Sequence, residues 1–326
     1  MNVVLRSICA TVLLCLAAAS ADAEVRLRLA HTLSTTDTHH LAALKFKELV
    51  EAATKGEIRV SVHPAGELGN DPALLEGLRL GTIDAAFTGN PFYTRFEPKL
   101  NAIDLPYLFK NHEHVYRVID GPIGQELLAG LEKHRMKPLA FWEIGFRHIT
   151  NSKRAIKTPK DLEGLKIRTT PNPAHVLAFK LLGAIPTPLP FTEVYMALET
   201  HAVDGQENPV FQISANRLHE VQKHMSLTGH AYTASIVAMS QSKWTSLNPA
   251  QQTAVMEAAK TAQTYQRELN AKANGEAMEL IRKAGLGIVE DIDTAAFQAI
   301  VAEPVKANYV KDHGSTIVDA IVKAGQ

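Results

Sequence analysis

The sequence has little of several features that would point to particular functions. It contains only two cysteines, Cys9 and Cys15, and both lie in an apolar stretch near its start. If that stretch is removed, the rest of the chain has no thiol, which excludes a disulfide framework, a cysteine nucleophile and a cysteine metal site. The 34 basic and 34 acidic side chains balance to a net charge of zero, whereas binding to nucleic acid calls for a basic surface.

Motifs for catalysis and for metal binding are also missing. The chain has no G-x-S-x-G nucleophile elbow, no S-x-x-K with its supporting motifs, and no G-x-G-x-x-G or phosphate loop. His219 and His224 frame a segment one residue too long for an H-E-x-x-H zinc helix, and the histidines of 39–40 and 112–114 diverge on a helix. We expect no metal, no cofactor and no enzymatic activity, with an exported enzyme acting on sugar acids as the alternative.

The first 23 residues have the layout of a secretory signal peptide. Arg6 gives a basic start, residues 8–19 are apolar, and A-D-A ending at Ala23 is a small-x-small cleavage site. The apolar run is too short for a stable membrane span. We expect export and cleavage after Ala23. The alternatives are a buried N-terminal helix and a lipid anchor on Cys15, and Leu14 argues against the anchor because a small residue is wanted there.

Strand and helix patterns alternate along the chain. Residues 25–31 read V-R-L-R-L-A-H, which is the period of a half-buried strand, and apolar residues recur at helical spacing from residue 39. The alternation continues in strands at 58–64, 83–88, 138–150 and 234–240 and in helices at 72–80, 112–119 and 124–134, with a buried, non-helical segment at 105–109. This order predicts an α/β fold with a mainly parallel sheet.

The length of the chain predicts two domains. About three hundred residues usually split into two, and no glycine- or serine-rich linker marks a boundary, so we expect several crossings between the lobes. Residues 248–284 form one helical pattern of roughly 50 Å, longer than a single lobe. We predict a two-lobe α/β fold with a long helix spanning both lobes. The predicted lobes are residues 24–145 with 234–273, and residues 146–233 with 274–326.

Residues 164–209 carry the predicted ligand site. G-L-K-I-R delivers Arg168 at the carboxyl end of a strand, and V-D-G-Q-E-N-P ends another strand at Glu207 and Asn208. Open α/β folds bind ligands outside the carboxyl ends of their strands. A guanidinium group holds a carboxylate or phosphate with two parallel hydrogen bonds, and an asparagine amide suits a hydroxyl or a carboxylate oxygen. The segment therefore predicts a site for a small anion.

The ordered motifs of this region resemble those of the solute-binding proteins of TRAP transporters. They are G-L-K-I-R, G-A-x-P-T-P, F-T-E-V-Y-x-A-L and V-D-G-Q-E-N-P, together with H-P-A-G-E-L-G from His63, L-P-Y-L-F from Leu105, G-F-R-H-I-T-N from Gly145 and the stretch around His230. The resemblance covers nearly all of the chain after residue 23. It implies the periplasmic binding protein fold, a hinge helix, a periplasmic location and an ion-driven cycle with two integral membrane subunits. We expect the chain itself to be a monomer.

The resemblance also implies roles for individual residues. Arg168 would clamp the carboxylate of the ligand, and Arg147 would reach the same ligand or else support the hinge. Phe191 would form part of the pocket wall, with a core position as the alternative, while Glu207 would orient an arginine or accept from a ligand hydroxyl. Further polar side chains are expected at the ligand, with loop capping or a structural strand end as the alternative: His31, Thr38 and Asn90 from the facing lobe, and Asn172.

The candidate residues also indicate a class of ligand. Apart from the arginines they form hydrogen bonds and carry no positive charge, which favours a hydroxylated monocarboxylate such as a uronate or an aldonate. A C4-dicarboxylate is the alternative. It would want a second cationic clamp, which the sequence does not reveal.

Overall fold

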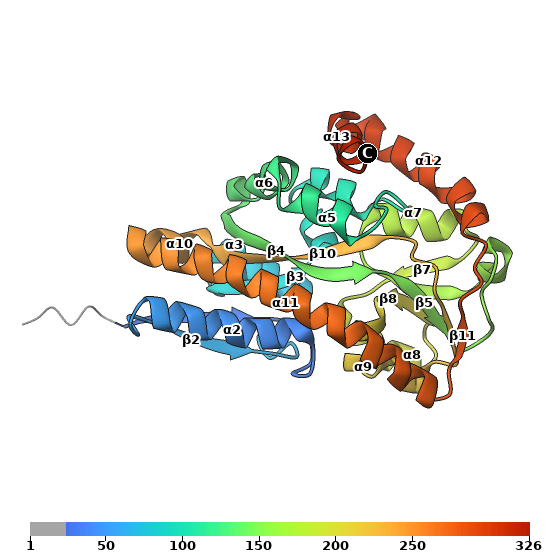
Figure 1. The fold of residues 1–326 in the computed structure, drawn as a ribbon, viewed down its shortest axis with the longest axis horizontal. Helices are drawn as coiled ribbons and strands as arrows, with labels where there is room; N and C mark the ends of the chain where they lie inside the picture. Colours follow the sequence, from blue (N-terminus) through green and yellow to red (C-terminus); the bar gives the residue numbers. More distant parts are fainter. Residues whose placement is uncertain (1–23) are drawn as a thin grey trace, which may run out of the picture.

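Two sheets form the framework of the protein in a computed structural model that describes residues 24–326 (Figure 1). The predicted signal peptide and its cleavage site lie outside the described residues. The first sheet has the order β2 (Ile58–His63), β1 (Val25–Ala30), β3 (Ala85–Gly89), β10 (Tyr232–Ser240) and β4 (Met136–Phe146). The second has the order β11 (Gly287–Val289), β9 (His224–Ser226), β5 (His148–Asn151), β8 (Gly205–Asn208), β6 (Lys166–Thr169) and β7 (Ile185–Pro188). We call each sheet with its covering helices a lobe, the first and the second. This arrangement of sheets and helices confirms the predicted α/β class.

Parallel strands joined by helices build the start of the first lobe, as predicted. β1 pairs in parallel with β2 and β3, whereas β10 runs antiparallel to both β3 and β4. In β1 the buried Leu27 and Leu29 alternate with arginines that face outward, as the pleat of a strand requires. The helices of this lobe are α2 (Thr38–Ala53), α3 (Asp71–Leu80), α4 (Asn90–Tyr93), the 3-10 helices η1 (Pro98–Asp104) and η2 (Glu132–His134), α5 (His112–Ile119), α6 (Pro122–Ala129) and α10 (Gln241–Ser246).

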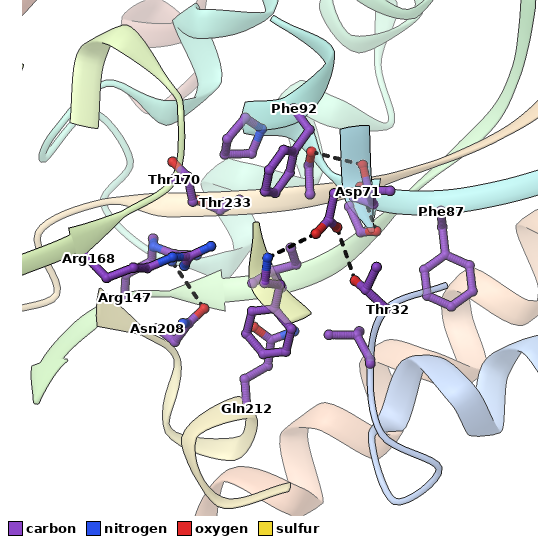
Figure 2. Close-up of a pocket in the computed structure, with 17 residues that line it drawn as sticks. Thr32, Asp71, Phe87, Phe92, Arg147, Arg168, Thr170, Asn208, Gln212 and Thr233 are labelled. Atoms are coloured by element: carbon purple, nitrogen blue, oxygen red, sulfur yellow. Dashed lines mark hydrogen bonds between the residues drawn. The ribbon is translucent and has the colours of Figure 1, made fainter. Parts of the chain in front are cut away.

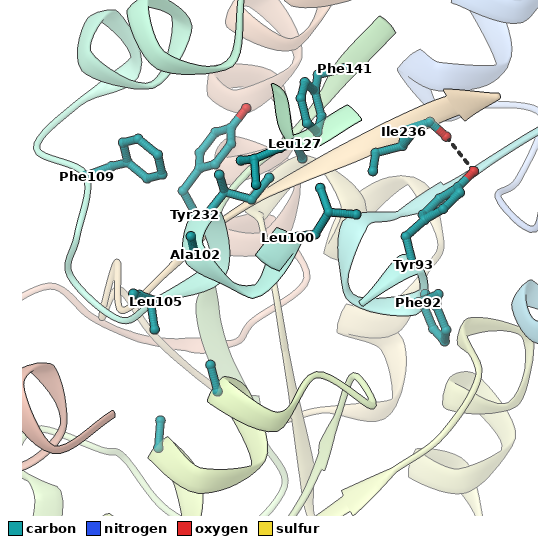
Figure 3. Packing of buried hydrophobic residues seen from close by; sticks show 14 of the residues in the cluster. Phe92, Tyr93, Leu100, Ala102, Leu105, Phe109, Leu127, Phe141, Tyr232 and Ile236 are labelled. Carbon is teal, nitrogen blue, oxygen red and sulfur yellow. Dashed lines mark hydrogen bonds between the residues drawn. The ribbon is translucent and has the colours of Figure 1, made fainter. Parts of the chain in front are cut away.

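One part of the core of the first lobe lies between β10 and the segment that follows β3. Tyr93 donates a hydrogen bond from its hydroxyl to the Ile236 carbonyl at 3.0 Å, and Phe109 meets Tyr232 edge to face (Figure 3). Leu105 and Phe109 are buried in a non-helical segment, which confirms that prediction. The packed segment fixes the end of η1, which contributes a buried carboxylate discussed below.

The chain crosses from the first lobe to the second within residues 138–150, for which the sequence predicts a single strand. The structure divides this stretch into β4 and β5, with Arg147 at the break. Gly145 makes the bend possible, because its φ of +115° suits glycine. The amide of Arg147 donates to the carbonyl of Ala231 at 2.8 Å, so the outgoing chain is tied to the chain that returns into β10.

The second lobe contributes short helices between its strands. They are the 3-10 helices η3 (Pro159–Leu162), η4 (Phe191–Glu193) and η5 (Leu218–Val221), and the α-helices α7 (Pro173–Leu181), α8 (Val194–Glu199) and α9 (Val210–Ala215). β6 runs parallel to both β7 and β8, while β5 is antiparallel to its two neighbours. The carboxyl ends of β6 and β8 therefore lie at the same edge of the sheet.

One long helix spans both lobes, as predicted. Helix α11 (Pro249–Lys283) starts with a capping box of Asn248 and Gln251, and its 35 residues correspond to roughly 50 Å. It packs on α2 and β4 of the first lobe and on α9 of the second (Figure 1). The buried side chain of Gln266 accepts from the amide of Glu143 at 2.9 Å and donates to its carbonyl at 2.8 Å, which fixes the helix to β4.

The end of the chain returns to the first lobe. The sequence predicts residues 274–326 within the second lobe, and β11 does join the second sheet, but α12 (Thr294–His313) contacts both α7 and η1. α13 (Thr316–Ala324) packs against α5 and α6, where His114 Nε2 lies 2.7 Å from the Ile321 carbonyl. Its apolar face, including Ile317 and Ile321, completes the core of the first lobe. In residues 24–326 no helix combines the length and apolarity needed to cross a membrane.

Candidate functional site

Three polar side chains meet at the edge of the second sheet: Arg147 directly precedes β5, Arg168 lies in β6 and Asn208 ends β8 (Figure 2). β6 and β8 are in register at Arg168 and Gln206, and β5 is in register with β8 at His148 and Asn208. Both arginines are only 1% exposed. The strand pairing therefore brings two buried guanidinium groups to one place.

Arg147 is held by a buried carboxylate. Its Nε donates to Glu207, and its Nη2 donates to Glu207 Oε1 at 3.0 Å and to Asn208 Oδ1 at 3.1 Å. His230 Nε2 lies 3.3 Å from the other oxygen of Glu207. Burial alone would raise the pKa of Glu207, but the positive charge of Arg147 and the bond from His230 hold that pKa well below its usual range. Glu207 is therefore ionised and fixes the orientation of Arg147.

Arg168 has no carboxylate partner among the residues that the structure describes. Its Nε and Nη2 both donate to the carbonyl of Leu189, at 3.0 and 2.5 Å, and its guanidinium carbon lies 6.0 Å from the centre of the Phe191 ring. Burial lowers the pKa of Arg168 to about 10, against the opposing pull of Glu207. Arg168 is thus a buried cation that is hydrogen-bonded to a neutral carbonyl and still charged at neutral pH.

Each arginine keeps one terminal nitrogen available. Within residues 24–326 neither Nη1 atom has a hydrogen-bond partner, and both side chains line the same cavity. A carboxylate has two oxygens that accept such donors, and the low dielectric of a buried site strengthens charge-assisted bonds. The geometry can therefore hold one carboxylate between two guanidinium groups.

The cavity lies between the lobes and has a different chemistry on its other side. It encloses about 440 Å³ of space between atoms, part of it open to solvent. Asp71, at the start of α3, accepts from the Thr32 hydroxyl at 3.0 Å and from the Phe191 amide of the facing lobe at 3.0 Å (Figure 2). Burial raises the pKa of Asp71. Further hydroxyl and amide side chains line the cavity from both lobes: Thr32, Thr88, Thr233 and Ser235 from the first and Thr170 and Gln212 from the second.

The structure brings together four of the predicted ligand residues: Arg147, Arg168, Phe191 and Asn208 all line the cavity. Phe191 sits at the start of η4, with its amide tied to Asp71. The amide nitrogen of Asn208 donates to Gln206 at 2.6 Å, so both polar ends of Asn208 already have partners. Glu207 lies behind the arginine, in the position expected for an orienting group.

The other four predicted residues do not line this cavity. His31 is bonded to His40 Nδ1 at 3.0 Å and stacks on Phe87. Thr38 donates to Asn270 of α11. Asn90 and Asn172 both donate to Asp104. Each of the four side chains has a structural partner, as in the alternative interpretation of the sequence pattern, although Asn90 Oδ1 has none among the described residues.

Sequence reasoning missed Asp71 and the hydroxyl groups around it. In the sequence Asp71 stands in G-N-D-P, which reads as the first turn of a helix, and that is also its position in α3. Thr32 directly follows His31, so the sequence indicates this strand end, and the structure places Thr32 rather than His31 at the cavity. No metal-binding group of three or more His, Cys, Asp or Glu side chains occurs in the part of the chain that the structure describes.

Comparison with known sequences identifies the family. The profile of the bacterial extracellular solute-binding proteins, family 7 (DctP), matches residues 29–312. The chain belongs to this family. Solved relatives of this chain are TRAP periplasmic solute-binding proteins, so the chain is a solute-binding receptor of this type.

Characterised relatives of this receptor bind different acids. The 2,3-diketo-L-gulonate-binding periplasmic protein YiaO of Escherichia coli K12 is 39% identical over 304 residues, which cover 93% of each chain. A TRAP periplasmic solute-binding protein from Polaromonas, bound to D-erythronate, is 35% identical with a TM-score of 0.89, covering 92% of this chain and 98% of its own. A TRAP protein from Sulfurospirillum deleyianum with bound succinate is 30% identical with a TM-score of 0.89, covering 93% of this chain and all of its own.

Proposed function

We propose that this receptor binds a hydroxylated monocarboxylate, a sugar acid of the aldonate or uronate class. The observation that carries the proposal is the division of the cavity. Two buried arginines with free Nη1 atoms lie on one side, and Asp71 with its hydroxyl neighbours lies on the other. The carboxylate end of the ligand meets the arginines, and its hydroxyl groups meet the second side.

The ligand residues have distinct roles in this proposal. Arg168 and Arg147 donate from Nη1 to the two oxygens of the carboxylate, and Phe191 covers the ligand. Asn208 holds Arg147 in place and faces the ligand as part of the wall. Each oxygen of Asp71 accepts one hydrogen bond within the protein, from Thr32 or from Phe191. Each oxygen can accept a further bond, and ligand hydroxyls donate to these free positions.

The position of Asp71 disfavours a C4-dicarboxylate. A second carboxylate on the ligand would lie in the half of the cavity that holds Asp71, where like charges repel. Among the residues that line the cavity, the only cations are Arg147 and Arg168, and both serve the first carboxylate. Because the Sulfurospirillum relative has bound succinate, a C4-dicarboxylate is the alternative ligand class in the experiment below.

Closure of the lobes is the mechanism we propose for uptake. Arginines of the second lobe capture the carboxylate, and groups of the first lobe complete the contacts only when the cleft closes. A ligand shifts the balance between open and closed forms only by its preference for the closed form. We further propose that the chain is exported with cleavage after Ala23, works as a monomer, performs no chemistry on its ligand and delivers it to the membrane subunits of a TRAP transporter.

A thermal-shift panel tests the proposal. The chain from Glu24 onward is melted with D-galactonate, D-galacturonate, D-erythronate and succinate at equal concentrations, because binding to the native state raises the melting temperature. We expect larger shifts with the sugar acids than with succinate, and the recovered acids unchanged. A larger shift with succinate would replace the ligand class, and consumption of a bound acid would replace the receptor by an enzyme.

A further inference from the structure

The two asparagines expected at the ligand converge instead on a buried aspartate. Asn90 Nδ2 lies 2.5 Å from Asp104 Oδ2, Asn172 Nδ2 lies 2.9 Å from the same oxygen, and Thr233 Oγ1 donates to Oδ1 at 3.0 Å. Asp104 ends η1 and is fully buried. No proposed ligand contact involves this carboxylate, since Asp104 does not line the cavity.

The three donors come from different lobes. Asn90 and Thr233 belong to the first lobe, like Asp104, whereas Asn172 precedes α7 of the second lobe. The carboxylate therefore keeps two donors within its own lobe and gains the third across the cleft. A hydrogen bond to a charged group is stronger than one between neutral groups, so this third bond favours the arrangement in which the lobes meet, most strongly at a pH at which Asp104 is ionised.

Within residues 24–326 no cation is bonded to Asp104. His175 Nε2 of α7 lies 4.0 Å from Asp104 Oδ1, and burial lowers the pKa of His175 to about 3, so the imidazole is neutral. Burial raises the pKa of Asp104 to about 7, against the opposing effect of its hydrogen bonds from Asn90 and Thr233 and of the positive charge of Arg147, so the carboxylate is ionised above that pH. The buried charge of Asp104 is therefore stabilised mainly by its hydrogen-bond donors, and the loss of any one donor weakens that stabilisation.

We call Asp104 and its three donors, Asn90, Asn172 and Thr233, the node. The node adjoins the ligand cavity. Thr233 lines the cavity and bonds to Asp104, and Thr170 lines it from the second lobe and lies 2.9 Å from His175 Nδ1. The bond between Asp104 and Asn172 therefore joins the lobes next to residues that line the cavity from each lobe, although Asp104 and Asn172 do not line it themselves.

We propose that Asp104 and Asn172 form a latch between the lobes, and that this latch sets the affinity of the receptor for every ligand by stabilising the closed form. The inference rests on the proposed function, because it presumes a ligand that is held by closure. Asp104 and Asn172 are positioning residues in this account. Weakening the latch lowers the closed population and hence the apparent affinity by the same factor for each ligand.

Asn172 offers a clean test because its two polar atoms have separate tasks. Its Oδ1 caps α7 by accepting from the amides of Ala174 and His175, and its Nδ2 reaches Asp104. Serine caps helices as well as asparagine does, so Asn172→Ser keeps the cap and removes the latch. Asn70→Ser is the matched control, since Asn70 caps α3 in the same way and its Nδ2 has no partner among the described residues.

Calorimetric titration with D-galactonate and D-erythronate measures the effect. We expect Asn172→Ser to weaken the affinity for both acids by the same factor, at least tenfold or about 1.4 kcal/mol, and Asn70→Ser to change it less than twofold. Wild-type affinity in Asn172→Ser, or a loss confined to one acid, would overturn the latch. Asp104→Asn is the second variant, which keeps the shape of the node and replaces charge-assisted bonds by neutral ones. We expect a loss in the same direction, whereas lower thermal stability with unchanged affinity in both variants would reduce the node to a structural role.

Solution scattering supplies a readout that needs no ligand. We expect ligand-free Asn172→Ser to have a larger radius of gyration than Asn70→Ser, because fewer molecules are closed. Equal radii in the two variants would overturn the latch even if the wild-type chain bound neither acid. A wild-type chain that bound neither acid would by itself refute the proposed function, so the two failures are distinguishable.

Discussion

Replacing Arg168 by methionine should strongly weaken ligand binding and leave the protein about as stable as before. Burial lowers the pKa of Arg168 from 12.5 to about 10, which at 1.36 kcal/mol per pKa unit corresponds to about 3 kcal/mol by which folding disfavours the positive charge. This cost is present at every pH below about 10. Removing the charge removes the cost, while the carbonyl of Leu189 loses its donors, which costs about 1–3 kcal/mol.

The two changes in the free energy of unfolding nearly cancel, so we expect the melting temperature of the ligand-free Arg168→Met chain to move by only a few degrees. The loss of affinity is much larger. Removing one partner of a buried, hydrogen-bonded charge pair costs about 2–5 kcal/mol, which corresponds to an affinity roughly 30-fold to several thousandfold weaker. Calorimetric titration and thermal melting of the same preparation measure both quantities.

Arg147→Met is the matched comparison. Arg147 neutralises the buried carboxylate of Glu207, and removal of one partner from a buried ion pair is destabilising by about 3–5 kcal/mol. We expect this variant to lose both ligand binding and about 10 °C of melting temperature. If Arg168→Met were destabilised as strongly as Arg147→Met, Arg168 would be a structural residue. Near-normal affinity in Arg168→Met would refute its assignment to the ligand carboxylate.

Three further predictions concern other parts of the receptor. Asp71→Ala should weaken the affinity for D-galactonate about tenfold or more and that for succinate less; equal losses in parallel titrations would remove Asp71 from hydroxyl recognition. Glu207 has a lowered pKa in the folded protein, so its stabilisation is present above its unfolded pKa of about 4.5 and is lost as the pH falls below it. Melting curves from pH 3 to 7 should therefore be flatter for Glu207→Gln, and parallel curves would contradict the ionised state. Gln266→Met leaves the amide and carbonyl of Glu143 without this partner and should destabilise the chain by about 1–3 kcal/mol in urea unfolding; an unchanged midpoint would show that the helix-to-strand bonds are dispensable.

Local sequence patterns were enough for most of the fold. The period of two in β1 and the capping signals of α11 are properties of neighbouring residues, and they predicted both elements closely. The break at Arg147 was not predicted, because it depends on how two lobes meet, although Gly145 marks the place where the backbone can bend. The docking of α13 on the first lobe was missed for the same reason, since its apolar face fits either lobe as far as the sequence can tell.

The site was predictable where strand ends alone position the side chain. Arg168 and Asn208 are at the carboxyl ends of adjacent strands, and the structure places both at the cavity. Asn90 and Asn172 have equally suitable positions, yet their amides turn to Asp104, a residue 14 positions from one and 68 from the other. The acceptor to which each amide donates depends on residues that are distant in the sequence, so the pattern of polar residues alone could not predict it.

Calorimetric titration of D-galactonate into the chain from Glu24 tests the central claim most directly, with Arg168→Met titrated in parallel. We expect saturable binding with one site per chain, an affinity higher than that for succinate, and binding to the variant that is roughly 30-fold weaker or more. The absence of heat with every sugar acid, or equal binding by Arg168→Met, would contradict the claim that this cleft is an arginine-clamped sugar-acid site.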